Sequence, residues 1–308
     1  MKRSVRIGYA LLLLLGALIW GLAFAFQSIG MESTGPFTFT GTRFYLATAV
    51  VFVFSLITDA GKRSKSGTKD LPEGHSWKSA RLWKAGIITG ILLTIATNLQ
   101  QIGIIYTDSV GKAGFITAMY IVLVPVFGIF LGKKPSPVIW LCVAISVAGL
   151  YFLTMKEKMS FSAGDLLILA CAFVFALQIL VIDKYSREVD NIKFACIEFL
   201  TVSIISSCIM FIVEKPDVSS VLAAAVPILY AGVLSGGAGY TIQIVCQSKL
   251  DPGVASILMS CEALFSVLGG FVLLGQKLSV REMAGSALMF AAIIIVQIVP
   301  GEKKQEKA

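Results

Sequence analysis

Long apolar segments constrain the fold of this 308-residue chain more than any other feature. A helix needs about 20 residues to cross a hydrocarbon core of roughly 30 Å. Only 14% of the residues are charged, whereas soluble domains contain about 25%, and the apolar runs are continuous rather than alternating as in barrel strands. We therefore predict an all-α integral membrane protein whose ten transmembrane helices cover residues 7–29, 36–58, 82–105, 109–131, 138–155, 164–183, 192–213, 221–246, 253–275 and 282–300.

The first half of the chain recurs in the second half. Each half holds five apolar segments, and an odd number of crossings places the second copy upside down in the bilayer, a recurring design of transporters. We predict two inverted five-helix repeats, residues 1–156 and 157–308. The matched positions are Phe24-Ala25-Phe26-Gln27 with Phe175-Ala176-Leu177-Gln178, Phe39 with Phe194, Arg43 with Glu198, Phe44 with Phe199, Gln100 with Gln243, Asp108 with Asp251, Met119 with Glu262 and Gly132 with Gly275.

Basic residues are distributed unevenly between the two sides that this topology defines. With a cytoplasmic N-terminus, nineteen of the 26 Lys and Arg residues fall in cytoplasmic segments, six fall in external segments, and Arg43 lies within a span. Cytoplasmic loops of membrane proteins carry such an excess. We therefore expect a multi-pass protein of the cell membrane with both termini in the cytoplasm. The net charge of +8 is then a topology signal and not a nucleic-acid-binding surface.

The segment between the second and third spans, residues 59–81, is rich in Lys, Ser and Gly and predicts a flexible cytoplasmic tether. It contains the only histidine, His75, without a ligand cluster around it, and the six cysteines lie in predicted spans without paired spacing. The chain also lacks a G-x-S-x-G elbow, a P-loop and a G-x-G-x-x-G sequence. We expect no metal site, no cofactor and no catalytic residue.

Three charged residues fall deep inside predicted spans: Arg43, Glu198 and Glu262. A charge at the centre of a span costs roughly 2.5–3.5 kcal/mol on insertion scales, so such residues usually face a bundle interior or a wet cavity. Structural pairing is the alternative for Arg43 and Glu198, whereas the deeper Glu262 favours a cavity role. We predict that Arg43 attracts an anionic group and that Glu198 and Glu262 are candidates for ion coupling.

Uncharged polar and aromatic side chains follow helical spacing on one face of five spans. Each such group can make one directed contact with an organic solute. The alternative is ordinary hydrogen bonding between helices, worth about 0.6 kcal/mol per contact. Convergence over five helices favours a solute cavity, and we predict its contacts as Trp20, Gln27, Arg43, Asn98, Gln101, Tyr120, Tyr240, Gln243 and Glu262.

Small residues mark places where helices approach closely or bend. Gly86-xxx-Gly90 and Gly232-xxx-Gly236 are small-xxx-small sequences, and Pro125 predicts a bend in the fourth span. A close-packed seam and a hinge are both consistent with the two glycine pairs.

Short motifs in both halves resemble one known family. The motifs are Trp20-Gly21, Pro36, Arg43, Asn98-xx-Gln101-x-Gly103, Tyr106, Lys112-Ala113-Gly114-Phe115, Pro125 and Gly285. With these motifs the chain resembles, over nearly all of residues 7–299, the EamA family of the drug/metabolite transporter superfamily. The resemblance implies a ten-helix bundle with a central cavity among helices 1–4 and 6–9, and a homodimer contact at helices 5 and 10.

The chain departs from this family at two helix ends. Family members commonly end span nine, and often span four, with Gly-Glu, whereas this chain has Gly275-Gln276 and Gly132-Lys133. If the family's Glu fixes these ends or couples protons, this chain achieves the same by other residues.

The resemblance implies export or exchange of amino acids, other metabolites or toxic compounds. We predict a permease or exporter of small organic solutes that works by alternating access, with the solute and the lipid bilayer as its partners. A sugar-phosphate or nucleotide-sugar exchanger is an alternative that would need several basic residues within the membrane, and only Arg43 and Lys112 qualify. A non-transporting sensor or assembly protein would need a signalling domain, and the longest predicted loop is residues 59–81.

Overall fold

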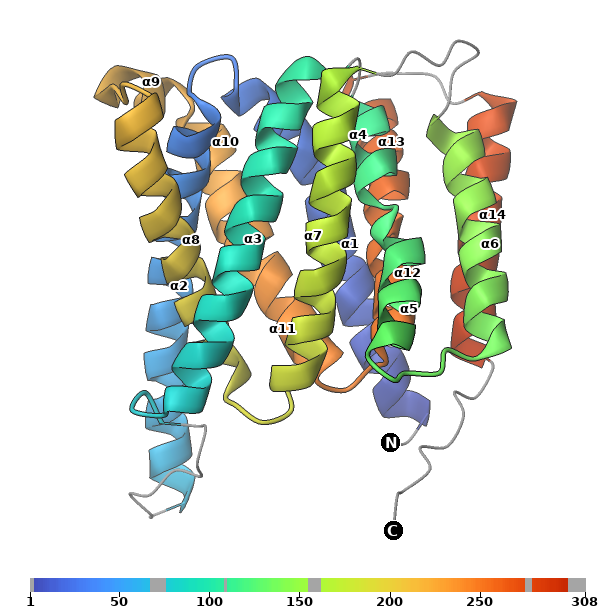
Figure 1. Cartoon of the computed structure of the whole chain (residues 1–308), viewed down its shortest axis with the longest axis horizontal. Coiled ribbons are helices and arrows are strands. Elements are labelled where there is room, and N and C mark those ends of the chain that lie inside the picture. Colours follow the sequence, from blue (N-terminus) through green and yellow to red (C-terminus); the bar gives the residue numbers. More distant parts are fainter. Residues whose placement is uncertain (1–2, 67–75, 108–109, 155–161, 275–278, 299–308) are drawn as a thin grey trace.

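The computed structural model describes residues 3–66, 76–107, 110–154, 162–274 and 279–298, and over these residues it contains helices and no strand. The long helices run side by side in one bundle (Figure 1). Their bounds are α1 Arg3–Gly30, α2 Pro36–Ser66, α3 Ala80–Tyr106, α4 Val110–Thr117, α5 Tyr120–Phe130, α6 Pro137–Thr154, α7 Ala163–Tyr185, α8 Asn191–Val213, α9 Val218–Ala223, α10 Ala225–Leu229, the π-helix η1 Tyr230–Tyr240, α11 Thr241–Gln247, α12 Pro252–Met259, α13 Cys261–Leu274 and α14 Val280–Ile298.

The bundle has the lengths and the surface of a membrane protein. Within the described residues, seven helical stretches are long and apolar enough to cross a membrane, and two shorter apolar stretches cover Pro137–Phe152 and Pro252–Val267. Large apolar side chains such as Phe52, Phe54 and Ile57 of α2 are exposed. An exposed apolar surface of this kind suits contact with lipid. The prediction of an all-helical membrane protein is confirmed.

Short polar side chains set where several spans begin, because the first backbone N–H groups of a helix need acceptors. Ser79 accepts from Leu82 N before α3, and Asp190 accepts from Ile192 N and Lys193 N before α8. Ser162 and Asp165 form a capping box at α7. These caps stand directly beside apolar runs, where unpaired backbone groups would be costly.

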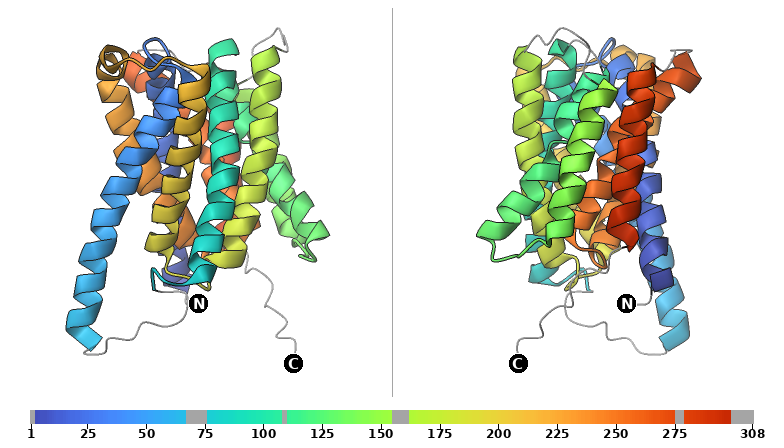
Figure 2. Two further views of the ribbon diagram at one scale, coloured as in Figure 1. Left: turned by 60° about the vertical axis from the view of Figure 1, so that its left-hand side comes forward. Right: turned by 90° about the vertical axis from the view of Figure 1, so that its right-hand side faces the viewer.

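The predicted tether 59–81 is partly helical, which corrects its expected extent. Helix α2 continues to Ser66, and its lower end projects beyond the neighbouring helices (Figure 2). Residues 59–66 hold no proline, and the Asp59 carboxylate pairs with Lys193 Nζ of α8 at 2.9 Å. This ion pair holds the polar extension of α2 against α8. His75 lies outside the described residues.

Helices distant in sequence make the main packing seams. Helix α2 packs along α8, α3 against α7 and α8, α1 against α13 and η1, and α6 against α14. Both glycine pairs lie in such seams: a Cβ at Gly90 would come 2.5 Å from Cβ of Thr201 in α8, and one at Gly232 would come 2.8 Å from the Arg43 carbonyl oxygen in α2. In this structure the two glycine pairs therefore lie where helices pack closely, as the first of the two alternatives predicted.

The first described helix begins, and the last described helix ends, on the same side of the bundle. Helix α1 starts, and α14 ends, at the lower side in Figure 1, whereas α9 lies at the upper side.

Candidate functional site

Two apolar helical stretches are interrupted near the middle of the bundle. Helix α4 ends at Thr117 and α5 begins at Tyr120, while α12 ends at Met259 and α13 begins at Cys261. At the first break, the Met119 N–H bonds to the Ile116 carbonyl at 3.1 Å, a tightened turn. Because interrupted helices often border binding sites in transporters, this level of the bundle is a candidate site.

Pro125 does not lie at the first interruption, which occurs at Ala118 and Met119. The second interruption has no proline in its flanking turns, and the hydroxyl of Ser260 donates instead to the Ile257 carbonyl at 2.8 Å. Such back-bonding weakens or bends helices. The fourth predicted span is therefore interrupted six to seven residues before Pro125, and not at the proline that predicted a bend.

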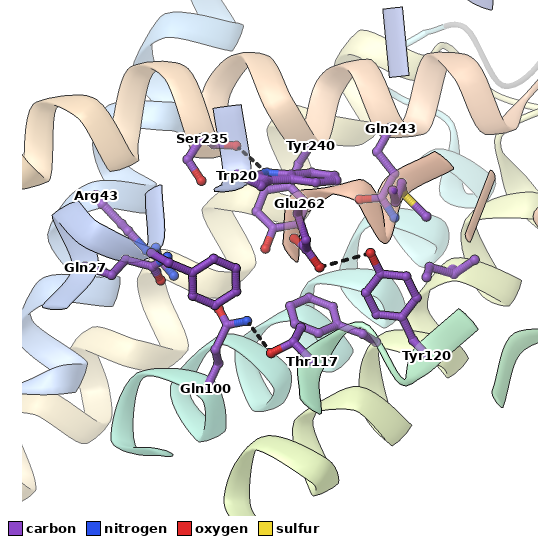
Figure 3. Close-up of a pocket in the computed structure, with 14 residues that line it drawn as sticks. Trp20, Gln27, Arg43, Gln100, Thr117, Tyr120, Ser235, Tyr240, Gln243 and Glu262 are labelled. Atoms are coloured by element: carbon purple, nitrogen blue, oxygen red, sulfur yellow. Dashed lines mark hydrogen bonds between the residues drawn. The ribbon is translucent and has the colours of Figure 1, made fainter. Parts of the chain in front are cut away.

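Both interruptions border a buried cavity of about 30 Å³ (Figure 3). That volume is close to the share of one liquid water, while sites for organic ligands usually measure about 300–1,000 Å³. The cavity is therefore too small to hold an organic solute in this conformation. Its lining residues are Trp20, Phe24, Gln27, Arg43, Gln100, Thr117, Tyr120, Phe175, Ile179, Ser235, Tyr240, Gln243, Met259 and Glu262.

Arg43 of α2 is the one basic residue in this lining and is almost fully buried. Its Nη1 donates to Gln27 Oε1 at 2.9 Å, and its guanidinium lies 5.4 Å from the Phe39 ring centre and 5.1 Å from that of Phe44. Its Nε has no hydrogen-bond partner. No described carboxylate pairs with Arg43, so one amide and two ring faces hold this cation and donor capacity remains.

Glu262 of α13 is the acidic residue in the lining, and it is also buried. The Tyr120 hydroxyl, from the other interrupted helix, donates to Glu262 Oε1 at 3.0 Å. Figure 3 shows the two side chains pointing toward one another, with Arg43 and Gln27 together at another part of the cavity. The site thus combines a guanidinium and a carboxyl group in one cavity whose lining also contains five aromatic side chains.

Trp20 and Tyr240 form an aromatic wall whose position depends on the π-helix η1. Trp20 Nε1 donates to the Ser235 carbonyl at 3.2 Å, and the two ring centres are 5.0 Å apart. A Cβ at Gly239 would come 2.6 Å from Trp20 Nε1. Gly239 is therefore needed for this indole to pack on η1, and π-helical turns are frequent at functional sites.

Glu198 lies outside the cavity lining, although it is linked to it. Gln243 Nε2 donates to Gln178 Oε1 at 3.2 Å, and Gln178 Nε2 donates to Glu198 Oε1 at 2.9 Å. The side chain of Glu198 is completely buried, and its Oε2 has no hydrogen-bond partner. Two hydrogen bonds thus separate this carboxyl group from the cavity residue Gln243.

Of the nine residues predicted as solute contacts, Asn98 and Gln101 do not line the cavity. Asn98 Nδ2 bonds to Ser206 Oγ of α8 at 3.0 Å, and Gln101 Nε2 bonds to the Gln27 carbonyl of α1 at 3.4 Å. These are contacts between helices. The other seven predicted contacts lie in the lining: Trp20, Gln27, Arg43, Tyr120, Tyr240, Gln243 and Glu262.

Gln100 lines the cavity in place of its neighbours on α3, and its Nε2 donates to Thr117 Oγ1 at 3.2 Å. The signal for Gln100 was present in the sequence, because Gln100 is the repeat partner of Gln243. Ser235, Phe175 and Ile179 also line the cavity. Lys112, the second candidate base, lies outside the lining and pairs with Asp165 at 2.6 Å.

The described residues contain no group of three or more His, Cys, Asp or Glu side chains that could hold a metal ion. The described cysteines are all free thiols, and five of the six are buried.

Comparison with known proteins identifies the family. A model of the EamA-like transporter family matches residues 7–155 and 162–298, once in each half of the chain. The chain belongs to the EamA-like transporter family. This match confirms the resemblance seen in the sequence and makes this chain a multi-pass membrane protein whose family members are transporters.

Relatives of this EamA-like chain carry the same general description. An uncharacterized transporter of Archaeoglobus fulgidus is 27% identical over 293 residues, which is 93% of this chain and 84% of the relative. The uncharacterized inner membrane transporter YedA of Escherichia coli K12 is 25% identical over 301 residues, 94% of this chain and 92% of the relative.

A solved crystal structure shares the fold of this EamA-like chain with a TM-score of 0.73 at 18% identity, covering 94% of this chain and 98% of the other. At that identity the likeness concerns the fold alone.

Proposed function

We propose that this chain is a cell-membrane exporter that moves small organic solutes through the central cavity by alternating access. The observation that carries the proposal is a small cavity between two interrupted helices, with Arg43 and Glu262 buried in its wall. Buried ionisable groups inside a membrane protein usually serve a transport path. A cavity of about 30 Å³ must widen before it admits a metabolite, and alternating access supplies that opening.

We propose further that the bundle consists of ten membrane-crossing helices in two inverted five-helix repeats. Repeat-matched residues make matched hydrogen bonds: Arg43 bonds to Gln27, and Glu198 bonds to Gln178, each at 2.9 Å. The interruptions of α4–α5 and α12–α13 also occupy matched positions. Packing follows the same symmetry, because α2 contacts its partner α8 and α6 contacts its partner α14.

The lower side in Figure 1 is proposed to face the cytoplasm. The helix ends on that side carry Arg6, Arg81, Lys133, Arg187 and Lys249. An excess of basic residues is typical of cytoplasmic ends. Both termini would then be cytoplasmic, and a homodimer contact at α6 and α14 stays a prediction.

The lining favours a solute that has both an anionic group and an apolar or aromatic body, such as an amino acid, another organic acid or an amphiphilic drug. Arg43 offers unused donors to a carboxylate, while Trp20, Tyr120 and Tyr240 offer ring surfaces. A sugar-phosphate or nucleotide-sugar exchanger is disfavoured, because the lining has a single basic residue and phosphate recognition typically uses several.

Comparative metabolite profiling tests this proposal. Cells lacking the protein would be supplied with the wild type or with an Arg43→Gln/Glu262→Gln double variant, at matched amounts of membrane-inserted protein. We expect one class of anionic organic solute to accumulate in the medium with the wild type only. Equal profiles for the two proteins would contradict a transport role for this cavity.

A further inference from the structure

A second cavity, of about 340 Å³, opens at the lower side of the bundle, apart from the central site. It lies between the ends of α5, α6, α12 and α14 and the beginning of α1. Its volume falls in the range of small-ligand sites. We call it the lower cavity, and its basic lining residues are Arg6, Lys133, Lys134, Arg187 and Lys249.

Positive charge exceeds negative charge around the lower cavity. Asp183 already pairs with Lys133 and with Arg187, the latter at 2.9 Å. Asp251 is the one acidic residue in the lining, and its Oδ1 caps α12 by accepting from Gly253 N at 2.9 Å. These two carboxylates leave three of the five positive charges without compensation.

Lys134 and Lys249 supply most of that surplus. Both side chains are exposed, and neither forms an ion pair with any carboxylate of the described residues. They stand on different loops, after α5 and after α11, so the fold and not the local sequence brings them to one cavity. Two unpaired ammonium groups facing one hollow suit a group that carries negative charge on several oxygens.

The backbone holds this site in place. Gly132 has a φ of 76°, and Lys133 N bonds to the Gly128 carbonyl at 2.9 Å. This is a Schellman-type end to α5, which strongly favours a glycine at that position. Since Lys133 then pairs with Asp183 of α7, the segment that carries Lys134 is tied to α7 at its beginning.

Most of the remaining wall is apolar, including Val124, Ile139, Val254 and Val296. A free phosphate ion has no apolar group that could contact these side chains, whereas a phospholipid can cover them with its acyl chains and glycerol backbone. Basic pockets between transmembrane helices on the cytoplasmic side bind anionic lipid headgroups in other proteins. We propose that the lower cavity binds the phosphate of an anionic phospholipid. Its placement in the cytoplasmic leaflet rests on the orientation proposed above, while the binding itself does not.

Thermal unfolding of the purified full-length protein in detergent tests this site at constant ionic strength. Phosphatidylglycerol, phosphatidylcholine or inorganic phosphate would be titrated into the wild type and the K134Q/K249Q variant. The K78Q/K84Q variant removes two exposed bases from the same side, outside the cavity. Each lost base should weaken binding about fivefold.

We expect phosphatidylglycerol to raise the unfolding midpoint of the wild type and of K78Q/K84Q at similar concentrations. K134Q/K249Q should need about 25-fold more lipid, and phosphatidylcholine should have little effect. A response to inorganic phosphate alone would overturn the lipid assignment in favour of a soluble phosphorylated ligand. Equal losses in both variants, or no response to either anion, would overturn the site itself, whatever the transport assays give.

Discussion

Arg43 and Glu262 place a basic and an acidic side chain in one cavity, and they have different surroundings. Arg43 rests on two phenylalanine rings and one amide, whereas Glu262 receives a hydrogen bond from Tyr120. Neither forms an ion pair with the other. Each side chain therefore keeps hydrogen-bonding capacity for a solute. Substituting them one at a time should separate recognition of the solute, at Arg43, from ion coupling, at Glu262.

Substitution of Arg43 should weaken recognition of the anionic part of the solute. A charge-assisted hydrogen bond contributes about 1.5–3 kcal/mol, so Arg43→Gln should raise the half-saturating solute concentration by about 10- to 150-fold. Arg43→Lys keeps the charge and should lose less. Transport by proteoliposomes of the solute found by profiling, and of its uncharged amide analogue, measures this. Equal losses for the two solutes would contradict anion recognition by Arg43.

Glu262 is the stronger candidate for ion coupling, because it borders the cavity while Glu198 lies two hydrogen bonds away. We expect wild-type transport to respond to an imposed pH gradient and Glu262→Gln to lose that response while inserting normally into the membrane. Glu188→Gln, at an exposed position, is the matched control. A wild type that ignores the gradient would indicate facilitated diffusion.

At the scale of elements, the packing of α3 on α8 depends on glycine. A Cβ at Gly90 would lie 2.5 Å from Thr201 Cβ, whereas a Cβ at Gly8 of α1 would meet nothing within 4 Å. Overpacking usually costs about 1–3 kcal/mol. We expect Gly90→Ala to lower the unfolding midpoint in detergent and Gly8→Ala to keep or raise it, since alanine favours helix. Equal unfolding midpoints for the two variants would contradict this expectation, because they would mean that α3 and α8 can move apart at little cost in stability.

The pair α2–α8 is held at both ends by charged side chains. At the upper end the Glu214 carboxylate accepts from Phe37 N at 2.9 Å and from Thr38 N at 2.8 Å. At the lower end Asp59 pairs with Lys193. Sequence patterns alone suggested neither contact, because both join residues more than 130 positions apart along the chain, where no local spacing rule applies.

At the scale of the whole molecule, the proposed orientation makes opposite ends of the bundle accessible from opposite sides of the membrane. Lys78 is exposed before α3 at the lower side, and Lys215 is exposed before α9 at the upper side (Figure 1). In a Cys208→Ser background, a membrane-impermeant maleimide added to whole cells should label Lys215→Cys and not Lys78→Cys. Permeabilised cells provide the control, since both variants should then react. The reverse pattern would invert the topology.

The sequence by itself determined that the chain lies in a membrane, which family it resembles and roughly where its helices run. Crossing a bilayer is a local requirement on the length and polarity of each segment, so it can be read along the chain. The caps at Ser79, Ser162 and Asp190 are likewise local. The repeat was also visible in the sequence, because it is found by matching one stretch of residues with another and needs no knowledge of packing.

Only the tertiary structure decided which side chains meet. In a soluble helix apolar residues mark the buried face, but in a bilayer the lipid-facing side is apolar as well, so periodicity does not tell how a helix is rotated. For this reason the sequence did not reveal that Gln100, and not Asn98 or Gln101, lines the cavity. Contact between Tyr120 and Glu262, and the meeting of Lys134 with Lys249, likewise depend on how distant helices pack.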